Sequence, residues 1–176
     1  MTRVLLLLLL SLAGPLPADD IYQSPQDFLA EVFSGEVPDP QTLWLRDSRR
    51  DASTEIMGHP YPGLRIRYWR QENRTAWILE EIGKEKPITT GLVVNNNRLE
   101  SIRVLTFRET RGWEVRYPFF TDQFIGSGLT TTNDLDRDID GISGATLSVR
   151  ALEKLARLAL YLHNEVMTEH DTPSPN

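Results

Sequence analysis

Four strand-like runs in the middle of the chain constrain its fold more than any other feature. Residues 64–69 alternate between apolar and polar side chains, as expected of a half-buried strand. Residues 76–82, 88–94 and 99–107 are rich in β-branched and aromatic residues, which favour strands. The asparagines at 95–97 suit a tight turn between the last two runs. Because the connections are short, the strands are expected to pair as antiparallel hairpins.

Helical patterns flank these strands. Ser24 suits an N-cap, Pro25 the first helical position and Asp27 a capping box, and Gly35 would end this helix. A weaker pattern covers 48–57 and stops at Gly58.

The last strong element is a helix over residues 146–166. Its apolar stripe is formed by Leu152, Leu155, Ala159, Leu162 and Val166. Residues 118–138 are loop-like. The sequence therefore predicts an α+β fold, with a mainly antiparallel sheet, flanking helices and a C-terminal helix. We expect a helical N-terminal segment at 19–62, a main domain at 63–168 and a disordered tail at 169–176.

The first 18 residues resemble a secretory leader. Arg3 precedes an apolar run at 4–12, and Ala18 is a small residue at the expected cleavage position. The alternative is a membrane anchor, but the run is shorter than the roughly 20 residues that span a bilayer. We predict cleavage after Ala18 and an extracytoplasmic, most naturally periplasmic, soluble chain without a transmembrane segment.

Composition removes several functions. The absence of cysteine excludes disulfides, Cys-ligated metals and thiol catalysis. With 19 Lys and Arg against 25 Asp and Glu, the net charge is -6, which disfavours nucleic-acid binding. His59, His163 and His170 show no metal-ligand spacing, and we predict no metal site.

The entry to the last helix allows two interpretations. Asp136, Asp138, Asp140 and Gly141 match the opening of an EF-hand calcium loop, but the twelfth position is Leu147 where a bidentate Glu is needed. Alternatively, Gly141, Gly144 and nearby hydroxyls would let a phosphate approach the helix N-terminus. Many helices begin with such residues only for capping.

The string at this entry is more specific than a glycine-rich turn. Asp140, Gly141, Ile142, Ser143, Gly144, Ala145 and Thr146 resemble the flavinylation motif of the FMN-binding domain family. That family includes the C subunit of the sodium-pumping NADH:quinone oxidoreductase and the G subunit of the Rnf complex. The resemblance implies that FMN is bound to Thr146 through a phosphoester. It also implies attachment by a separate extracytoplasmic flavin transferase that uses FAD and magnesium.

The resemblance extends upstream. Glu109, Thr110 and Gly112 resemble the family's E-T-x-G element beside the flavin, although Arg111 stands where many members have proline. Gln123, Phe124 and Gly126 resemble a further family element. Trp113 is a candidate for stacking on the flavin, whereas Trp77 is expected in the core. The main domain at 63–168 is on this basis predicted to be the FMN-binding domain.

These observations predict a secreted, covalently flavinylated electron-transfer protein. We expect it to act as an electron-transfer protein or redox subunit and not as a stand-alone enzyme. No residue would then act as a catalytic acid, base or nucleophile. The implied partners are the transferase and a membrane redox protein. Two alternatives stay open, a non-redox accessory or binding module of the same fold and the calcium-binding protein. Arg65, Arg67 and Arg70 mark either a solvated strand face or a docking patch for an acidic partner.

Overall fold

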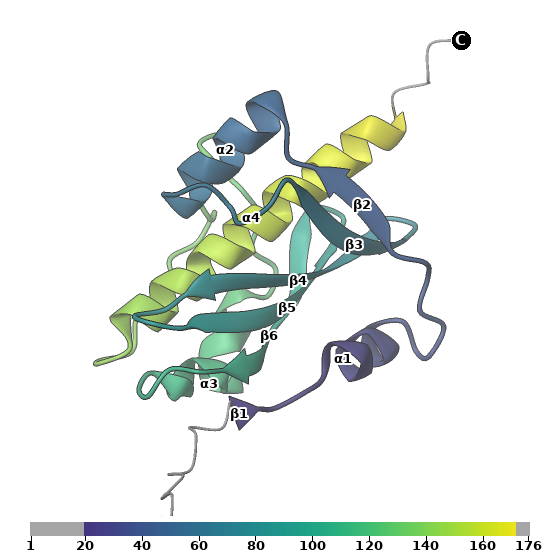
Figure 1. Cartoon of the computed structure of the whole chain (residues 1–176). Helices are drawn as coiled ribbons and strands as arrows, with labels where there is room; N and C mark the ends of the chain where they lie inside the picture. The colour runs from purple at the N-terminus through teal and green to yellow at the C-terminus, as the bar shows by residue number, and fades with distance from the viewer. Residues whose placement is uncertain (1–19, 172–176) are drawn as a thin grey trace, which may run out of the picture.

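A single antiparallel sheet organises the chain. The structure is a computed structural model that describes residues 20–171, so the predicted leader lies outside the described residues. The six strands are β1 (Asp20–Ile21), β2 (Gln41–Trp44), β3 (Arg65–Gln71), β4 (Arg74–Ile82), β5 (Pro87–Asn95) and β6 (Arg98–Phe107). Their order across the sheet is β1-β6-β5-β4-β3-β2, and every pairing is antiparallel (Figure 1).

Helices cover both faces of the sheet. They are α1 (Pro25–Val32), α2 (Asp47–Met57), the 3-10 turn η1 (Trp113–Arg116), α3 (Pro118–Thr121), the 3-10 turn η2 (Asp122–Phe124) and α4 (Thr146–Asp171). The α+β class and the C-terminal helix are thus confirmed. Ser24 caps α1 as predicted, since its Oγ accepts from the N–H of Asp27 at 3.0 Å. Within residues 20–171, none of the helices has the length and apolarity needed to cross a bilayer.

The structure differs from the sequence-based expectations in three places. The segment predicted as helical at 19–62 also supplies β1 and β2, which are too short to show a clear alternation. The region 118–138 was predicted as a loop but opens with α3 and η2. Helix α4 continues to Asp171, past its predicted end at 166 and into the predicted tail, because no Gly or Pro interrupts it before Pro173.

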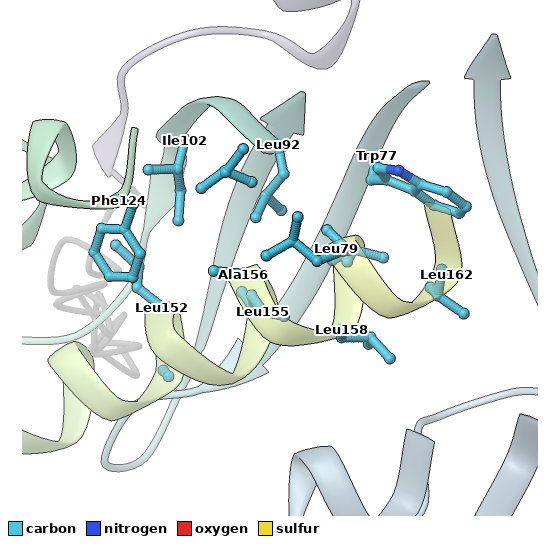
Figure 2. Packing of buried hydrophobic residues seen from close by; sticks show 14 of the residues in the cluster. Trp77, Leu79, Leu92, Ile102, Phe124, Leu152, Leu155, Ala156, Leu158 and Leu162 are labelled. Carbon is cyan, nitrogen blue, oxygen red and sulfur yellow. The ribbon is translucent and has the colours of Figure 1, made fainter. Parts of the chain in front are cut away.

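The main core lies between α4 and the sheet. The predicted stripe of α4 is fully buried, with Leu152, Leu155, Ala159, Leu162 and Val166 at 0% exposure. Figure 2 shows three of these leucines facing Trp77, Leu79, Leu92 and Ile102 of the strands. Trp77 is therefore a core residue as expected, and it stacks on Tyr68 with 5.1 Å between ring centroids. On the opposite face, α1 packs a second cluster against β4, β5 and β6.

The α1 cluster depends on one glycine, and this generates a prediction. A Cβ at Gly91 would lie 2.7 Å from the ring of Phe28. We expect Gly91→Ala to lower the free energy of unfolding by about 1–3 kcal/mol, because the ring has to move out of a packed site. Gly141→Ala is the control, since a Cβ there meets nothing within 4 Å. Urea denaturation of the two variants checks this, and equal midpoints would contradict it.

A buried histidine links α4 to the sheet. His163 is fully buried, with its Nδ1 2.8 Å from Thr75 Oγ1 and its Nε2 accepting from the N–H of Asn97 at 3.3 Å. Burial, with a smaller effect from Arg70, lowers the pKa of His163 to about 4. The neutral ring therefore belongs to the folded state.

Acid should weaken the fold through this ring. When the pKa of a histidine is lower in the folded state than in the unfolded state, the protein loses stability as the pH falls below about 6.5. We expect a loss of up to about 3 kcal/mol in the free energy of unfolding by about pH 4. His163→Gln, which takes up no proton, should remove this slope, and His59→Gln should leave it in place. Urea titrations between about pH 6.5 and pH 4 measure this pH dependence. The prediction is contradicted if the free energy of unfolding of His163→Gln falls with pH as steeply as that of the wild type.

Candidate functional site

The start of α4 and two loops form an open pocket. Its volume is about 530 Å³, and it is lined by Lys84, Glu109, Thr110, Arg111, Gly144, Ala145, Thr146, Leu147 and Ser148. Thr146 is the first residue of α4 and is exposed. The N–H groups of a first helical turn have no partner within the helix, and the helix dipole is positive there. The pocket thus places a free hydroxyl beside groups that attract an anion.

Glu109 fixes one wall of this pocket. Its Oε1 accepts from the backbone N–H groups of Lys84, Glu85 and Lys86 at 2.5, 2.6 and 2.9 Å. These three residues form the turn between β4 and β5. Burial raises the pKa of Glu109, but the hydrogen bonds from the three N–H groups lower it by more. The net result is a pKa below the usual value. The carboxylate therefore holds the turn to the loop that follows β6.

Gly112 brings that loop against the helix. Its φ is +86°, and a Cβ there would lie 2.6 Å from Ser148 Oγ and 3.4 Å from Ala145 Cβ. Only glycine combines this backbone conformation with such a close approach. Glu109 and Gly112, which belong to the predicted E-T-x-G element, thus have structural roles that join it to the start of α4.

The loop at 140–145, called here the motif loop, turns sharply into α4. The N–H of Ala145 donates to the carbonyl of Ile142 at 3.0 Å, and the carbonyl of Ala145 accepts the first bond of the helix, from Val149. Gly144 has a φ of +83°, which favours glycine. The N–H of Asp140 donates to Gln123 Oε1 at 2.7 Å. Gln123, part of the predicted Q-F-x-G element, therefore anchors the beginning of this loop.

The predicted residues do not all line the pocket. Gly144, Ala145, Thr146, Glu109 and Thr110 do. Gly112 supports the pocket from behind, Ile142 packs against the core, and Asp140, Gly141 and Ser143 are exposed on the motif loop. Trp113 is 42% exposed and contacts Tyr117 edge-on with 5.7 Å between ring centroids. It directly follows Gly112 in the sequence and does not line the pocket.

Sequence reasoning missed Lys84, Leu147 and Ser148 and gave Arg111 no role. Lys84 comes from the β4–β5 turn, which only the clamp by Glu109 brings to the pocket. Ser148 has the helical spacing of a first-turn residue, two positions after Thr146, and this spacing could have indicated it. Lys84 and Arg111 add positive charge to the pocket.

The calcium interpretation finds no support in the loop geometry. Asp136 is used elsewhere, because its carboxylate accepts from the N–H of Gly128 at 2.9 Å and forms an ion pair with Arg98. In the described part of the chain, no group of three or more His, Asp or Glu side chains is placed to hold a metal ion.

Taken together, the fold and the pocket define a domain that exposes a threonine hydroxyl and a helix N-terminus in one pocket. Residues 83–161 match the family model of the FMN-binding domain. This part of the chain is therefore an FMN-binding domain, as the motifs predicted, and the match supports an FMN-binding flavoprotein. All residues that line the pocket fall within the match. Among curated proteins, no significant match is found.

The Glu109 clamp makes a testable prediction. Glu109→Gln keeps an acceptor oxygen but removes the charge. Because the pKa of Glu109 is lowered in the folded protein, its carboxylate stabilises the fold above the unfolded pKa of about 4.3. This stabilisation is lost as the pH falls through the folded pKa. The melting temperature of the variant should be lower than that of the wild type at about pH 7, and the two should converge as the pH falls through the lowered folded-state pKa of Glu109.

Thermal unfolding followed by circular dichroism measures this difference. Glu85→Gln is the matched control, since Glu85 lies exposed on the same turn. A difference between wild type and Glu109→Gln that stays constant over the whole pH range would contradict the clamp.

Proposed function

We propose that this protein is an extracytoplasmic electron-transfer flavoprotein that carries FMN through a phosphoester on Thr146. The observation that supports it best is the convergence at Thr146. Two motifs separated by about 30 residues in the sequence meet there, in a pocket whose size is typical of small-molecule sites.

The residues present fit the phosphate end of FMN. Thr146 supplies an exposed hydroxyl oxygen for the ester. The free N–H groups of the first turn of α4 and the positive end of its dipole stabilise the phosphate charge. Lys84 and Arg111 lie in the same pocket and add to this field. Gly144 leaves the approach open, since a Cβ there would meet nothing within 4 Å.

The other end of FMN is an aromatic ring system, and the segment that follows the pocket-lining residues 109–111 in the chain carries exposed aromatic side chains. Trp113, Tyr117 and Phe119 are 42%, 38% and 64% exposed. Arg116 lies over the rings of Trp113 and Tyr117, at 5.3 and 4.8 Å from their centroids. These side chains can shield one edge of a bound ring system while leaving another edge accessible to a redox partner.

Bound FMN would supply the electron-accepting and electron-donating chemistry, and the protein would hold and orient it. A covalent link suits an exported carrier, because the cofactor cannot diffuse away. The chain has no cysteine, which excludes a thioether to the flavin, whereas a phosphoester needs only a hydroxyl such as that of Thr146. In this proposal Thr146 acts once, during attachment by a separate magnesium-dependent transferase that uses FAD. Export after cleavage near Ala18 and a membrane redox partner belong to the same proposal.

The proposal predicts a covalent mass shift that depends on one oxygen. After co-expression with a flavin transferase, the intact protein should gain the mass of one FMN less one water. Thr146→Ala should abolish the gain, whereas Thr146→Ser, which keeps a hydroxyl, should retain it. Ser143→Ala is the matched control, because Ser143 is an exposed hydroxyl three residues away.

Intact-mass spectrometry, with in-gel flavin fluorescence as a second readout, checks these variants. An unshifted wild-type mass and a colourless protein, despite an active transferase, would instead favour the non-redox accessory module. A shift that persists in Thr146→Ala would exclude Thr146 as the attachment site.

A further inference from the structure

Part of the sheet face that carries α1 is left uncovered by that helix and exposes charged and aromatic side chains. Ile66 and Tyr68 of β3 point to the α4 side and are buried in the main core. Because side chains alternate along a strand, Arg65, Arg67 and Trp69 point to the opposite side. Trp69 packs there at the edge of the α1 cluster. Arg70 has the other parity and lines a hollow with His163, so it does not belong to this surface.

Neighbouring residues extend this surface. Trp44 of β2 is directly opposite Arg65 in the sheet and is 43% exposed. Arg46 lies over the ring of Trp44, 4.7 Å from its centroid. We call Trp44, Arg46, Arg65, Arg67 and Trp69 the basic-aromatic face.

The three arginines of this face are not neutralised by the protein itself. Within residues 20–171, no ion pair involves Arg46, Arg65 or Arg67, and all three are exposed. The acid of β4 that points to the same side, Glu80, is engaged by residues of β5 and of the segment after β6. It accepts from Thr89 Oγ1 at 2.5 Å and lies 3.7 Å from Arg108 Nη1. Positive charge is therefore concentrated on one face of a chain whose net charge is -6.

The same face is hollowed. A pocket of about 330 Å³ is lined by Tyr61, Pro62, Arg65, Arg67, Trp69 and Ile78. Aromatic and aliphatic side chains line it together with the two arginines, a combination that suits an apolar side chain flanked by carboxylates. Exposed Trp and Arg side chains around such a hollow are the residue types that dominate binding energy at protein interfaces.

We propose that the basic-aromatic face binds an acidic segment of a partner protein, with an apolar side chain of that segment in the hollow. Charge complementarity with the three free arginines identifies the partner as acidic. The site is concave, which suits a protein segment better than a flat membrane surface. This protein is also acidic overall, so an anionic membrane would repel most of the molecule. This binding does not depend on FMN or on Thr146, so it stands or falls separately from the proposed function.

A peptide titration tests this proposal. The probe is a synthetic peptide that repeats Glu-Glu-Leu-Gly, and the comparison peptide has Lys in place of Glu. Added to the full chain, the acidic peptide should give saturable changes in tryptophan fluorescence and NMR shifts confined to the basic-aromatic face. The comparison peptide should not. Binding should weaken as the salt concentration rises, because the Debye screening length falls to about 3 Å at 1 M salt.

Charge reversal locates the site. The double variant Arg65→Glu/Arg67→Glu should weaken the binding about tenfold or more, since like charges then oppose each other. Arg50→Glu is the matched control, because Arg50 is an exposed arginine on α2, and it should bind like the wild type. Arg67→Gln is the milder variant if thermal unfolding shows that the double variant has lost its fold.

Three results would overturn the proposal. The first is unchanged affinity in the double variant or in a folded Arg67→Gln. The second is an equal loss in Arg50→Glu, which would show only a response to net charge. The third is binding to vesicles with anionic phospholipid that depends on Arg65 and Arg67, without binding of the acidic peptide. That result would assign the face to a membrane.

Discussion

The burial of one side of α4 against the sheet is the interaction on which the rest of the molecule depends. Leu152, Leu155 and Leu162 are removed from water completely, and burial of a leucine side chain contributes about 1.5–3 kcal/mol. Because the buried stripe runs along α4 from Leu152 to Val166, this packing positions the helix and with it its first turn. Thr146 is the exposed first residue of this helix, and the apolar side chains of the turns that follow it are buried against the sheet.

The site is then completed by loops that are held by backbone contacts. Glu109 binds three N–H groups of the β4–β5 turn, and Gln123 accepts from the N–H of Asp140. Gly112 lets one loop touch the helix at Ser148. Each contact joins segments that are distant in the sequence. The walls of the pocket are thus held by contacts within the protein, and such preorganisation lowers the ordering cost of binding.

Much of the fold could be predicted from the sequence because the strong patterns are local. The alternation at 64–69 and the stripe of α4 predicted β3 and the long helix. The edge strands β1 and β2 could not, since they are held by pairing with β6 and β3 and are too short to carry a pattern. The short helices after Gly112 were missed for a similar reason, because they are single turns stabilised by burial of Val115, Phe120 and Phe124.

The candidate site could be predicted only where a motif marks it. The string that ends at Thr146 carried the family resemblance, and the match to the FMN-binding domain confirms that family. Lys84 carries no such mark, because its place in the pocket depends on the clamp by Glu109. The basic-aromatic face shows the converse. Its arginines were visible in the sequence, but only the sheet separates Arg65 and Arg67 from Arg70.

The most direct test of the central claim is to locate the flavin on the polypeptide. Protein co-expressed with a flavin transferase is digested, and the flavin-bearing peptide is isolated by its absorbance and sequenced by mass spectrometry. The account predicts one modified peptide, with the FMN mass on Thr146 and phosphate as the linking group. A flavin on any other residue, or a digest in which every peptide that contains Thr146 is unmodified, would contradict it.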